Sequence, residues 1–200
     1  MSEEKDYYLE RVFEFTNEKH KNQKRKYTLE PYITHPVKVS RILEDTFSST
    51  PELYIYFDKH SIRYNCIIAA LLHDTVEDTD TTFNEIEENF GIRIRNILYY
   101  LTDISKPEDG NRKIRKEIDM YHNLNGPIES ILVKLADIID NCSSIKENDP
   151  EFAKKYLKEK QNFLLKIKDT GVYNKFKKGL EKPLFEVFDY LYNKAWEIVK

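Results

Sequence analysis

A histidine and three carboxylates within six residues, His73, Asp74, Glu77 and Asp78, have the clearest potential for chemistry in this chain. They follow the apolar run at residues 67–72, Ile-Ile-Ala-Ala-Leu-Leu, which is typical of a buried helix. Charges beside a core are costly unless something compensates them, and a bound metal cation is a common compensation. On a continued helix these residues form two pairs, each one turn apart, on adjacent stripes of one face. The segment therefore makes a metal-dependent hydrolase the leading hypothesis.

Two further segments contain residues suited to the same chemistry. His35 stands at the expected start of a helix, after Pro-Tyr-Ile-Thr, although a lone histidine is more often structural. In the apolar segment at residues 131–141, Lys134, Asp137 and Asn141 share one helical face by their spacing of three and four residues. The Asp137 carboxylate inside a buried helix needs a partner, which a salt bridge, a helix cap or a metal ion could supply.

Taken together, two histidines and two aspartates form a mixed set of nitrogen and oxygen ligands. Such a set suits Mn²⁺, Fe²⁺ or Mg²⁺ with some coordination positions left to water. Thiolate ligands are missing from it, so a structural zinc site is not expected. The metal would acidify a water molecule and orient it for attack on phosphorus. Glu77 and Asp78, one turn beyond, could accept the proton of that water.

The elements that must position these residues are predicted to be helices. The chain has 200 residues, enough for one domain, and only five glycines and seven prolines interrupt it. Hydrophobic residues recur with helical spacing along most of its length, and we therefore predict a single all-α domain. The expected helices span about residues 7–20, 35–43, 61–74, 82–91, 92–104, 109–124, 128–144, 150–168 and 173–199. Residues 48–60 fit either a short helix or an extended segment.

Composition limits the expected partners and the expected compartment. The formal net charge of −3 gives no reason to expect nucleic-acid binding. No run approaches the roughly 20 apolar residues that span a bilayer, so no membrane association is expected. The N-terminus lacks the apolar stretch of a signal peptide, and Cys66 and Cys142 fall in apolar helical patterns, so we expect a cytoplasmic protein with reduced thiols. Tyrosines of the last helices are expected to pack on the domain or to form a surface for a homo-oligomer.

The three segments together resemble the HD-domain phosphohydrolases. Within that superfamily they are most similar to the hydrolase domain of the RelA/SpoT homologues, in particular to the small stand-alone alarmone hydrolases. The resemblance spans about residues 10–170, and its most specific part is the His-Asp…Glu-Asp-Thr segment, because a general HD protein shares only the His-Asp pair. The matching segments are Arg25-Lys26, Pro31 to Pro36, Ala69 to Thr79, Leu101-Thr102-Asp103, and Val133 to Asp137 with Asn141.

The resemblance implies a fold, an activity and roles for individual residues. The fold would be one HD-domain helical bundle over residues 1–200, with the metal site between buried helices and residues 150–200 packed on the rest. The activity would be removal of the 3′-pyrophosphate from guanosine tetra- or pentaphosphate (ppGpp or pppGpp), usually with one Mn²⁺ per chain. The implied metal ligands are His35, His73, Asp74 and Asp137, and the implied catalytic carboxylates are Glu77 and Asp78. The implied or candidate substrate-binding residues are Lys24, Arg25, Lys26, Lys134, Asn141, Arg112 and Arg115.

The sequence departs from the family pattern at a few positions. The family usually has Arg, then His or Tyr, between Leu-Ala-Asp and the Asn, whereas Ile138, Ile139 and Asp140 fill that gap here. A glycine common before Pro-Tyr is absent from Leu29-Glu30. Two other functions stay open: a phosphohydrolase for another nucleotide, such as NADPH or a deoxynucleotide, and a non-catalytic module that senses alarmone or neutralises a partner synthetase. With 200 residues, a synthetase domain is not expected.

Overall fold

Helices account for the regular structure of the computed structural model, which describes residues 2–200, with side chains from residue 7 onward except at position 58. The helices are α1 (Ser2–Lys19), α2 (Thr34–Phe47), α3 (Pro51–Asp58), α4 (Ser61–Leu72), α5 (Thr75–Asp78), α6 (Phe83–Leu101), the 3₁₀ helix η1 (Pro107–Asp109), α7 (Arg112–Leu124), α8 (Ile128–Asn148), α9 (Pro150–Asp169), α10 (Val172–Gly179) and α11 (Lys182–Val199). Within the described residues, β pairing is confined to an isolated bridge between Lys24 and Pro31. The predicted all-α fold is confirmed.

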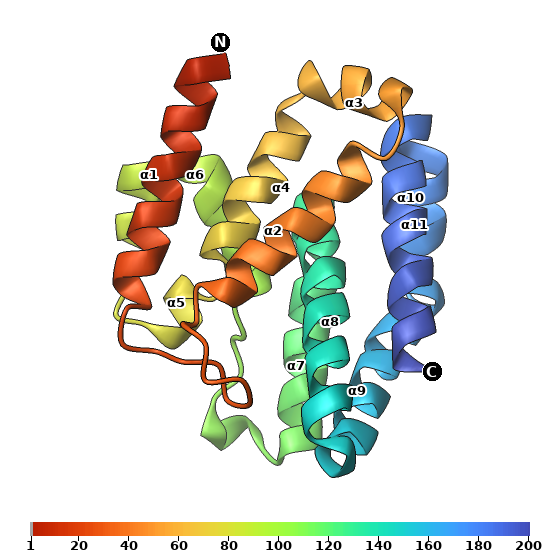
Figure 1. The fold of residues 1–200 in the computed structure, drawn as a ribbon. Coiled ribbons are helices and arrows are strands. Elements are labelled where there is room, and N and C mark those ends of the chain that lie inside the picture. Colours follow the sequence, from red (N-terminus) through yellow and green to blue (C-terminus); the bar gives the residue numbers. More distant parts are fainter. Residues whose placement is uncertain (1) are drawn as a thin grey trace.

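The centre of the molecule is formed by α4 and α8, with α2 packed against both (Figure 1). Seven consecutive residues of α4, Cys66 to Leu72, are buried, and α8 is buried on most of its circumference from Glu129 to Ile139. A helix that is apolar all round needs neighbours on every side. The helices α1, α6 and α7 supply them on one side of this centre, and α9 and α11 on the other.

The C-terminal helices pack on the rest of the structure, as expected. The last helix, α11, contacts α8, α9 and α2, and its buried face includes Phe188, Leu191 and Tyr192. The prediction of one helix over residues 173–199 is wrong, because α10 ends at Gly179 and α11 begins at Lys182. Pro183 explains the break, since proline fits the first turn of a helix but not its interior.

Three other local expectations are resolved by the structure. The ambiguous segment before α4 is helical: Thr50 caps α3 by accepting a hydrogen bond from the backbone N–H of Leu53. Gly91 separates two helical segments within α6, as expected, with φ at 85°, a value that favours glycine. The predicted helix at residues 61–74 ends earlier, at Leu72, so the carboxylates at positions 77 and 78 lie on the separate short helix α5.

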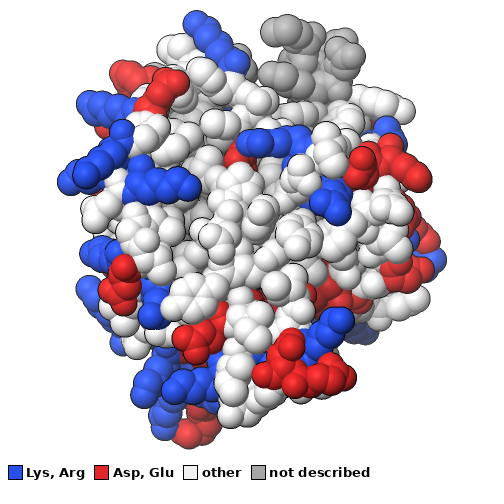
Figure 2. All heavy atoms as spheres, turned by 180° about the vertical axis from the view of Figure 1, so that it is seen from behind, with Lys and Arg blue, Asp and Glu red and all other residues white. Residues whose placement is uncertain are grey.

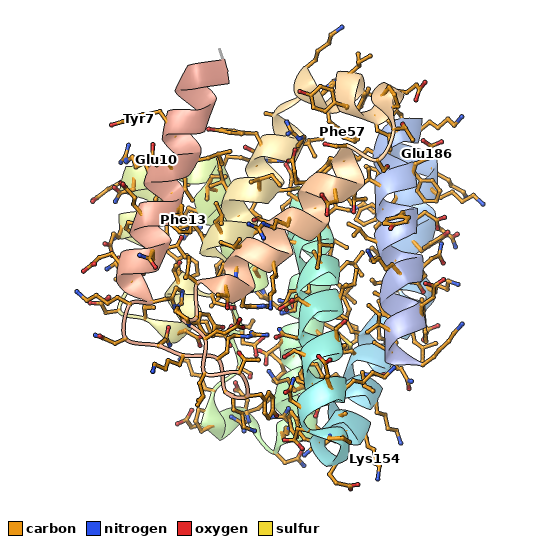
Figure 3. All side chains as sticks on the ribbon, viewed as in Figure 1. Tyr7, Glu10, Phe13, Phe57, Lys154 and Glu186 are labelled. Carbon is orange, nitrogen blue, oxygen red and sulfur yellow. The ribbon has the colours of Figure 1, made fainter. Side chains whose placement is uncertain are left out.

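Charged side chains cover the surface in mixed order. On the face seen in Figure 2, acidic and basic side chains are interspersed around a broad uncharged area. Side chains such as Tyr7 and Glu10 project away from α1, whereas Phe57 of α3 turns inward and packs on Phe47, with ring centroids 4.7 Å apart (Figure 3). Among the described residues, no helix combines the length and the hydropathy needed to cross a membrane. Both cysteines are buried free thiols.

Candidate metal centre and substrate cavity

The four predicted metal ligands converge from three separate elements. His35 lies in the first turn of α2, His73 and Asp74 follow the end of α4, and Asp137 lies in the middle of α8. Ligand atoms of His35, His73 and Asp74 all lie within 4.8 Å of one another. Oδ1 of Asp137 lies 3.3 Å from Nε2 of His35 and 3.8 Å from Nε2 of His73. Because α2, α4 and α8 pack on one another, the core itself holds these donors together.

The orientation of His73 fits a metal ligand. Its Nδ1 lies 2.8 Å from the backbone oxygen of Ala70, and since a carbonyl only accepts, Nδ1 carries the proton of this hydrogen bond. This turns Nε2 toward the carboxylates of the cluster. Nε2 is buried and has no hydrogen-bond partner among the described residues, although Oδ2 of Asp74 lies only 3.0 Å away. A buried polar atom of this kind needs a partner, and a cation between the donors would supply it.

The separations between donor atoms agree with a shared cation. They are 3.0 Å for His73 and Asp74, 3.5 Å for His35 and Asp74, and 3.3 Å for His35 and Asp137. Two ligands about 2.1 Å from one octahedral cation are roughly 3 Å apart when they are adjacent. The donor set is hard to intermediate in character and contains no thiolate, which suits a divalent cation such as Mg²⁺, Mn²⁺ or Fe²⁺.

The charges of this cluster support the same reading. Burial opposes the charged form of each carboxyl group, yet His73 and His35 hold the pKa of Asp74 below its ordinary value. Lys134 and His35 do the same for Asp137, so both carboxylates stay ionised. Burial would lower the pKa of His35, but neighbouring aspartates raise it to about 9. The positive charge of protonated His35 therefore compensates the carboxylates, as a bound metal cation would.

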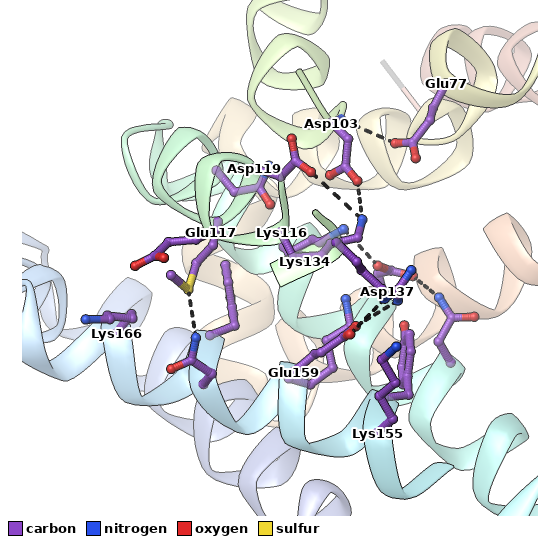
Figure 4. A pocket seen from close by; sticks show the side chains of 18 of the residues that line it. Glu77, Asp103, Lys116, Glu117, Asp119, Lys134, Asp137, Lys155, Glu159 and Lys166 are labelled. Atoms are coloured by element: carbon purple, nitrogen blue, oxygen red, sulfur yellow. Dashed lines mark hydrogen bonds and ion pairs between the residues drawn. The ribbon is translucent and has the colours of Figure 1, made fainter. Parts of the chain in front are cut away.

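A cavity of about 700 Å³ opens beside the cluster, between α5, α7, α8 and α9 (Figure 4). Asp74 and Asp137 lie in its wall, with Glu77 and Asp78 next to them. The backbone N–H of Asp103 donates to a carboxylate oxygen of Glu77 over 3.3 Å, which fixes the direction of that side chain. The cavity lining also includes Lys134, whose Nζ lies 3.2 Å from Asp137.

Glu77 and Asp78 are open to the solvent of this cavity, and both have raised pKa values. For Glu77 the first cause is its partial removal from water, followed by the negative charge of Asp103; Lys134 acts in the opposite direction. For Asp78 the first cause is again partial removal from water, followed by the charge of Asp74. A raised pKa makes a carboxylate a better proton acceptor near neutral pH.

A second cavity of about 310 Å³ adjoins the first one. It is lined by Arg25, Lys26, Tyr27, Tyr32, Asn141, Ser144, Ile145 and Phe152. Tyr32 and Asn141 line both cavities, so the two cavities lie side by side at these residues. Lys26 lies over the rings of Tyr27 and Phe152, at 4.7 and 5.5 Å from their centroids.

The structure does not gather all the predicted substrate-binding residues. Lys24 is exposed and its backbone bridges to Pro31, and it lines neither cavity. Arg115 is also absent from both linings. Arg112 lines the larger cavity, but Glu159 binds its guanidinium through two hydrogen bonds of 2.9 Å. The expectation that the whole basic run at residues 24–26 lines the site therefore does not hold for Lys24.

Three residues of the site had no role assigned from the sequence. Tyr32 donates its hydroxyl hydrogen to Oδ2 of Asp74 over 2.6 Å, and Asp140 lies 2.6 Å from Nδ1 of His35. Lys160 lines the larger cavity, and none of the ion pairs between described residues involves it. Asp140 could have been noticed as a charge in an apolar helix beside Asn141. Nothing in the sequence indicated a role for Lys160, because a lysine in an amphipathic helix normally lies on the solvated face.

Comparisons with known proteins agree with this site. Residues 13–163 match the family model described as HD domain. The guanosine-3′,5′-bis(diphosphate) 3′-pyrophosphohydrolase MESH1 of Xenopus tropicalis is 41% identical over 141 residues, which cover 68% of this chain and 69% of that protein. A protein of the same activity name from Aquifex aeolicus is 34% identical over 193 residues, or 96% of this chain. The chain spans only 25% of the Aquifex protein.

Solved structures show the same fold. The structure of a metazoan orthologue of SpoT, described as hydrolysing ppGpp, matches with a TM-score of 0.66 and 24% identity and covers 94% of both chains. The structure of lmo0812 from Listeria monocytogenes matches with a TM-score of 0.53 and 23% identity, over 86% of this chain and 99% of that one. From the family match and the MESH1 relative together, the chain belongs to the HD domain family and is similar there to the MESH1 proteins.

Proposed function

We propose that this protein removes the 3′-pyrophosphate from guanosine tetra- or pentaphosphate, giving GDP or GTP and pyrophosphate. The observation that carries the proposal is the convergence of two histidines and two aspartates on the wall of a cavity that also contains Glu77 and Asp78. Relatives at 34 and 41% identity carry the name of this activity. The cavity has the size that a nucleotide requires, and its mixed lining includes basic side chains, such as Lys134 and Lys160, that can bind phosphates.

We propose His35, His73, Asp74 and Asp137 as ligands of one Mn²⁺. The direction of Nε2 of His73 toward Asp74 and Asp137 and the ionised state of both aspartates support this assignment. A divalent cation bound there would supply Lewis-acid activation of the phosphoryl group and of the attacking water. The protein contributes the rigid donor arrangement, since the ligands are attached to three helices, α2, α4 and α8, that pack on one another.

Glu77 and Asp78 are the proposed proton acceptors. Both carboxylates face the cavity next to Asp74, and the raised pKa of each favours proton uptake in the neutral range. The hydrogen bond from the Asp103 N–H orients Glu77, so this carboxylate acts from a fixed position. Such help to proton transfer typically contributes about 10² to 10⁴-fold to the rate.

Basic side chains of the cavity would bind the phosphates. Lys134 lies beside Asp137, where it compensates that carboxylate and would stand close to a phosphate bound at the metal. Lys160 lines the same wall without a carboxylate partner among the described residues and is available to an anionic ligand. In the adjoining cavity, Arg25 and Lys26 would lie beside the nucleoside, and Asn141 would contact its sugar. Arg112 is a weaker candidate, because Glu159 already binds it.

Residues 1–200 are proposed to form one domain around this site. The contacts of α11 with α2, α8 and α9 support the proposal, because they connect the C-terminal helices directly with the helices that bear the ligands.

Product analysis tests the proposed function. The purified protein is incubated with Mn²⁺ and guanosine tetraphosphate, and the nucleotide and the released phosphate species are separated. We expect GDP and pyrophosphate in equal amounts. Release of orthophosphate alone from a nucleotide panel that includes NADPH and deoxynucleotides would favour a phosphatase. Binding of guanosine tetraphosphate without turnover would favour the non-catalytic module.

A further inference from the structure

We propose that Asp140 is a positioning residue that connects the metal centre with the nucleotide cavity. One of its carboxylate oxygens, Oδ2, lies 2.6 Å from Nδ1 of His35 and 3.2 Å from Nη2 of Arg25. The inference deepens the proposed function, because it rests on the metal role proposed for His35. It assigns a role to a residue of the segment 138–140, where the sequence departs from the family pattern.

The contact with His35 determines which ring nitrogen faces the centre. Asp140 accepts the Nδ1 hydrogen, so Nε2 of the same ring points to the other side, toward Asp137 at 3.3 Å and Asp74 at 3.5 Å. A carboxylate behind a histidine fixes its tautomer and its orientation, and it makes the free nitrogen a stronger donor to a metal. The His35 side chain is only 1% exposed, so water does not replace this partner.

The contact with Arg25 leads to the second cavity. Arg25 and Asp140 have side chains that are 13 and 12% exposed, and the ion pair is therefore largely screened from water. The guanidinium also donates to Oδ1 of Asn141 over 3.4 Å, and Asn141 in turn donates to Asp137. Asp140 thus belongs to a chain of contacts that begins at His35, passes through Arg25 and Asn141, and ends at Asp137.

This arrangement gives Asp140 two effects, which a buried ion pair alone would not have. Its negative charge strengthens the binding of a cation by His35, and its oxygen holds the Arg25 guanidinium at the wall of the nucleotide cavity. Removal of Asp140 should therefore weaken metal binding and nucleotide binding. Removal of Arg25 should weaken nucleotide binding and leave the histidine contact in place.

Metal titration of the apo-protein separates these effects. Mn²⁺ affinity is measured by calorimetry on the metal-free wild type and on the variants Asp140→Asn, Asp140→Ala, Arg25→Ala and Glu44→Gln. Glu44 is the matched control: it lies on α2 like His35 and pairs with an arginine, Arg63, away from the site. Loss of a carboxylate behind a metal-binding histidine typically costs 10- to 100-fold in metal affinity.

We expect the Asp140→Ala protein to bind Mn²⁺ about 10- to 100-fold more weakly. The Asp140→Asn protein should fall between it and the wild type, because the amide oxygen still accepts the Nδ1 hydrogen without the charge. Arg25→Ala should change Mn²⁺ affinity less than about threefold while weakening binding of GDP, and Glu44→Gln should change neither. Wild-type Mn²⁺ affinity in the two folded Asp140 variants would overturn the proposal.

A measurement on the wild type keeps the inference testable if the variants do not fold. In the protein loaded with diamagnetic Mg²⁺, nitrogen NMR of the His35 ring should show a hydrogen on Nδ1 and none on Nε2. A hydrogen on Nε2 would overturn the proposal. Neither measurement requires turnover, so failure to cleave guanosine tetraphosphate would overturn the proposed function and leave the role of Asp140 to be decided by metal affinity.

Discussion

Tyr32 donates a hydrogen bond of 2.6 Å from its hydroxyl group to Oδ2 of Asp74 and thereby joins the segment before α2 to the metal cluster. His20 stacks on the same ring, with centroids 4.7 Å apart. Burial and the charges of Asp74 and Asp78 raise the pKa of the phenol, so it remains a hydrogen donor at all ordinary pH values. Tyr32 therefore stabilises the ionised form of a carboxylate that is proposed to bind metal.

Replacement of Tyr32 by Phe removes this hydrogen bond and little else. Bonds to charged groups contribute about 1.5 to 3 kcal/mol, and since Tyr32 is half-buried we expect a loss of about 1 to 2 kcal/mol of unfolding free energy. Mn²⁺ affinity should fall by up to about tenfold. Tyr27→Phe is the control, because its hydroxyl makes a comparable bond of 2.9 Å to Asp149 outside the cluster. Equal Mn²⁺ affinities for the two variants would argue against a role for Tyr32 at the metal.

Replacement of the proposed proton acceptors should separate chemistry from binding. Glu77→Gln and Asp78→Asn keep the size of each side chain and remove its basicity. We expect turnover to fall by about 10² to 10⁴-fold, with Mn²⁺ and nucleotide affinity retained. Single-turnover kinetics and calorimetry measure the two quantities. Glu87→Gln, on the outer surface of α6 near Arg95, should behave like the wild type. Near-native turnover in either variant would remove that residue from the mechanism.

Removal of the metal should lower stability as well as activity. A ligand that binds only the folded state stabilises it by about 2.7 kcal/mol at 100 times its dissociation constant. Chelation should therefore lower the melting temperature, and added Mn²⁺ should restore it. In His73→Ala the response to Mn²⁺ should disappear. It should persist in His122→Ala, whose ring bonds to the carbonyl of Tyr99 on another part of the surface. Scanning calorimetry with and without chelator decides the matter.

Basic residues next to each other in the sequence should differ in their effect on binding. Arg25 lines the second cavity and Lys24 does not, so Arg25→Ala should weaken nucleotide binding and Lys24→Ala should change it little. Part of the Arg25 effect is electrostatic attraction, which salt screens. The ratio of the nucleotide dissociation constant of Arg25→Ala to that of the wild type should therefore shrink as ionic strength increases. Equal losses in both variants would indicate a diffuse positive field in place of a specific contact.

Lys160 should give ligand binding a pH dependence. Burial and the nearby charge of Lys134 lower its pKa to about 8. Without ligand, the folded protein releases this proton more readily than the unfolded chain, so unfolding free energy should rise as pH increases through about 8. Pyrophosphate binding should weaken over the same range, because the cation is lost.

Lys160→Met should remove both pH dependences and weaken pyrophosphate binding by about tenfold or more. Lys155→Met, on the same helix and at the more exposed part of the cavity, is the control. Calorimetric titration with pyrophosphate between pH 6.5 and 9.5, steps chosen to bracket the pKa of about 8, measures the effect. An unchanged pH profile in Lys160→Met would show that another group titrates there.

The sequence by itself determined the fold class and pointed to three of the four residues that are proposed as metal ligands. A run of apolar residues is a local property, and such runs located α4 and α8 because both helices are apolar on most sides. His73, Asp74 and Asp137 stood out for the same reason, since ionisable groups next to buried helices need compensation. The ligand role of His35 could be predicted only from the resemblance to a family, because a single histidine at the start of a helix has no distinctive pattern.

Only the tertiary structure decided how these residues meet. The approach of α2, α4 and α8 brings residues 35, 73 and 137 together, and no spacing along the chain encodes such a contact. The same packing turns Arg25 inward and leaves Lys24 outside, and it directs Lys160 into the cavity although its helix reads as amphipathic. The proposed role of Asp140 also depends on long-range contacts, because it arises from groups that are distant in sequence and adjacent in space.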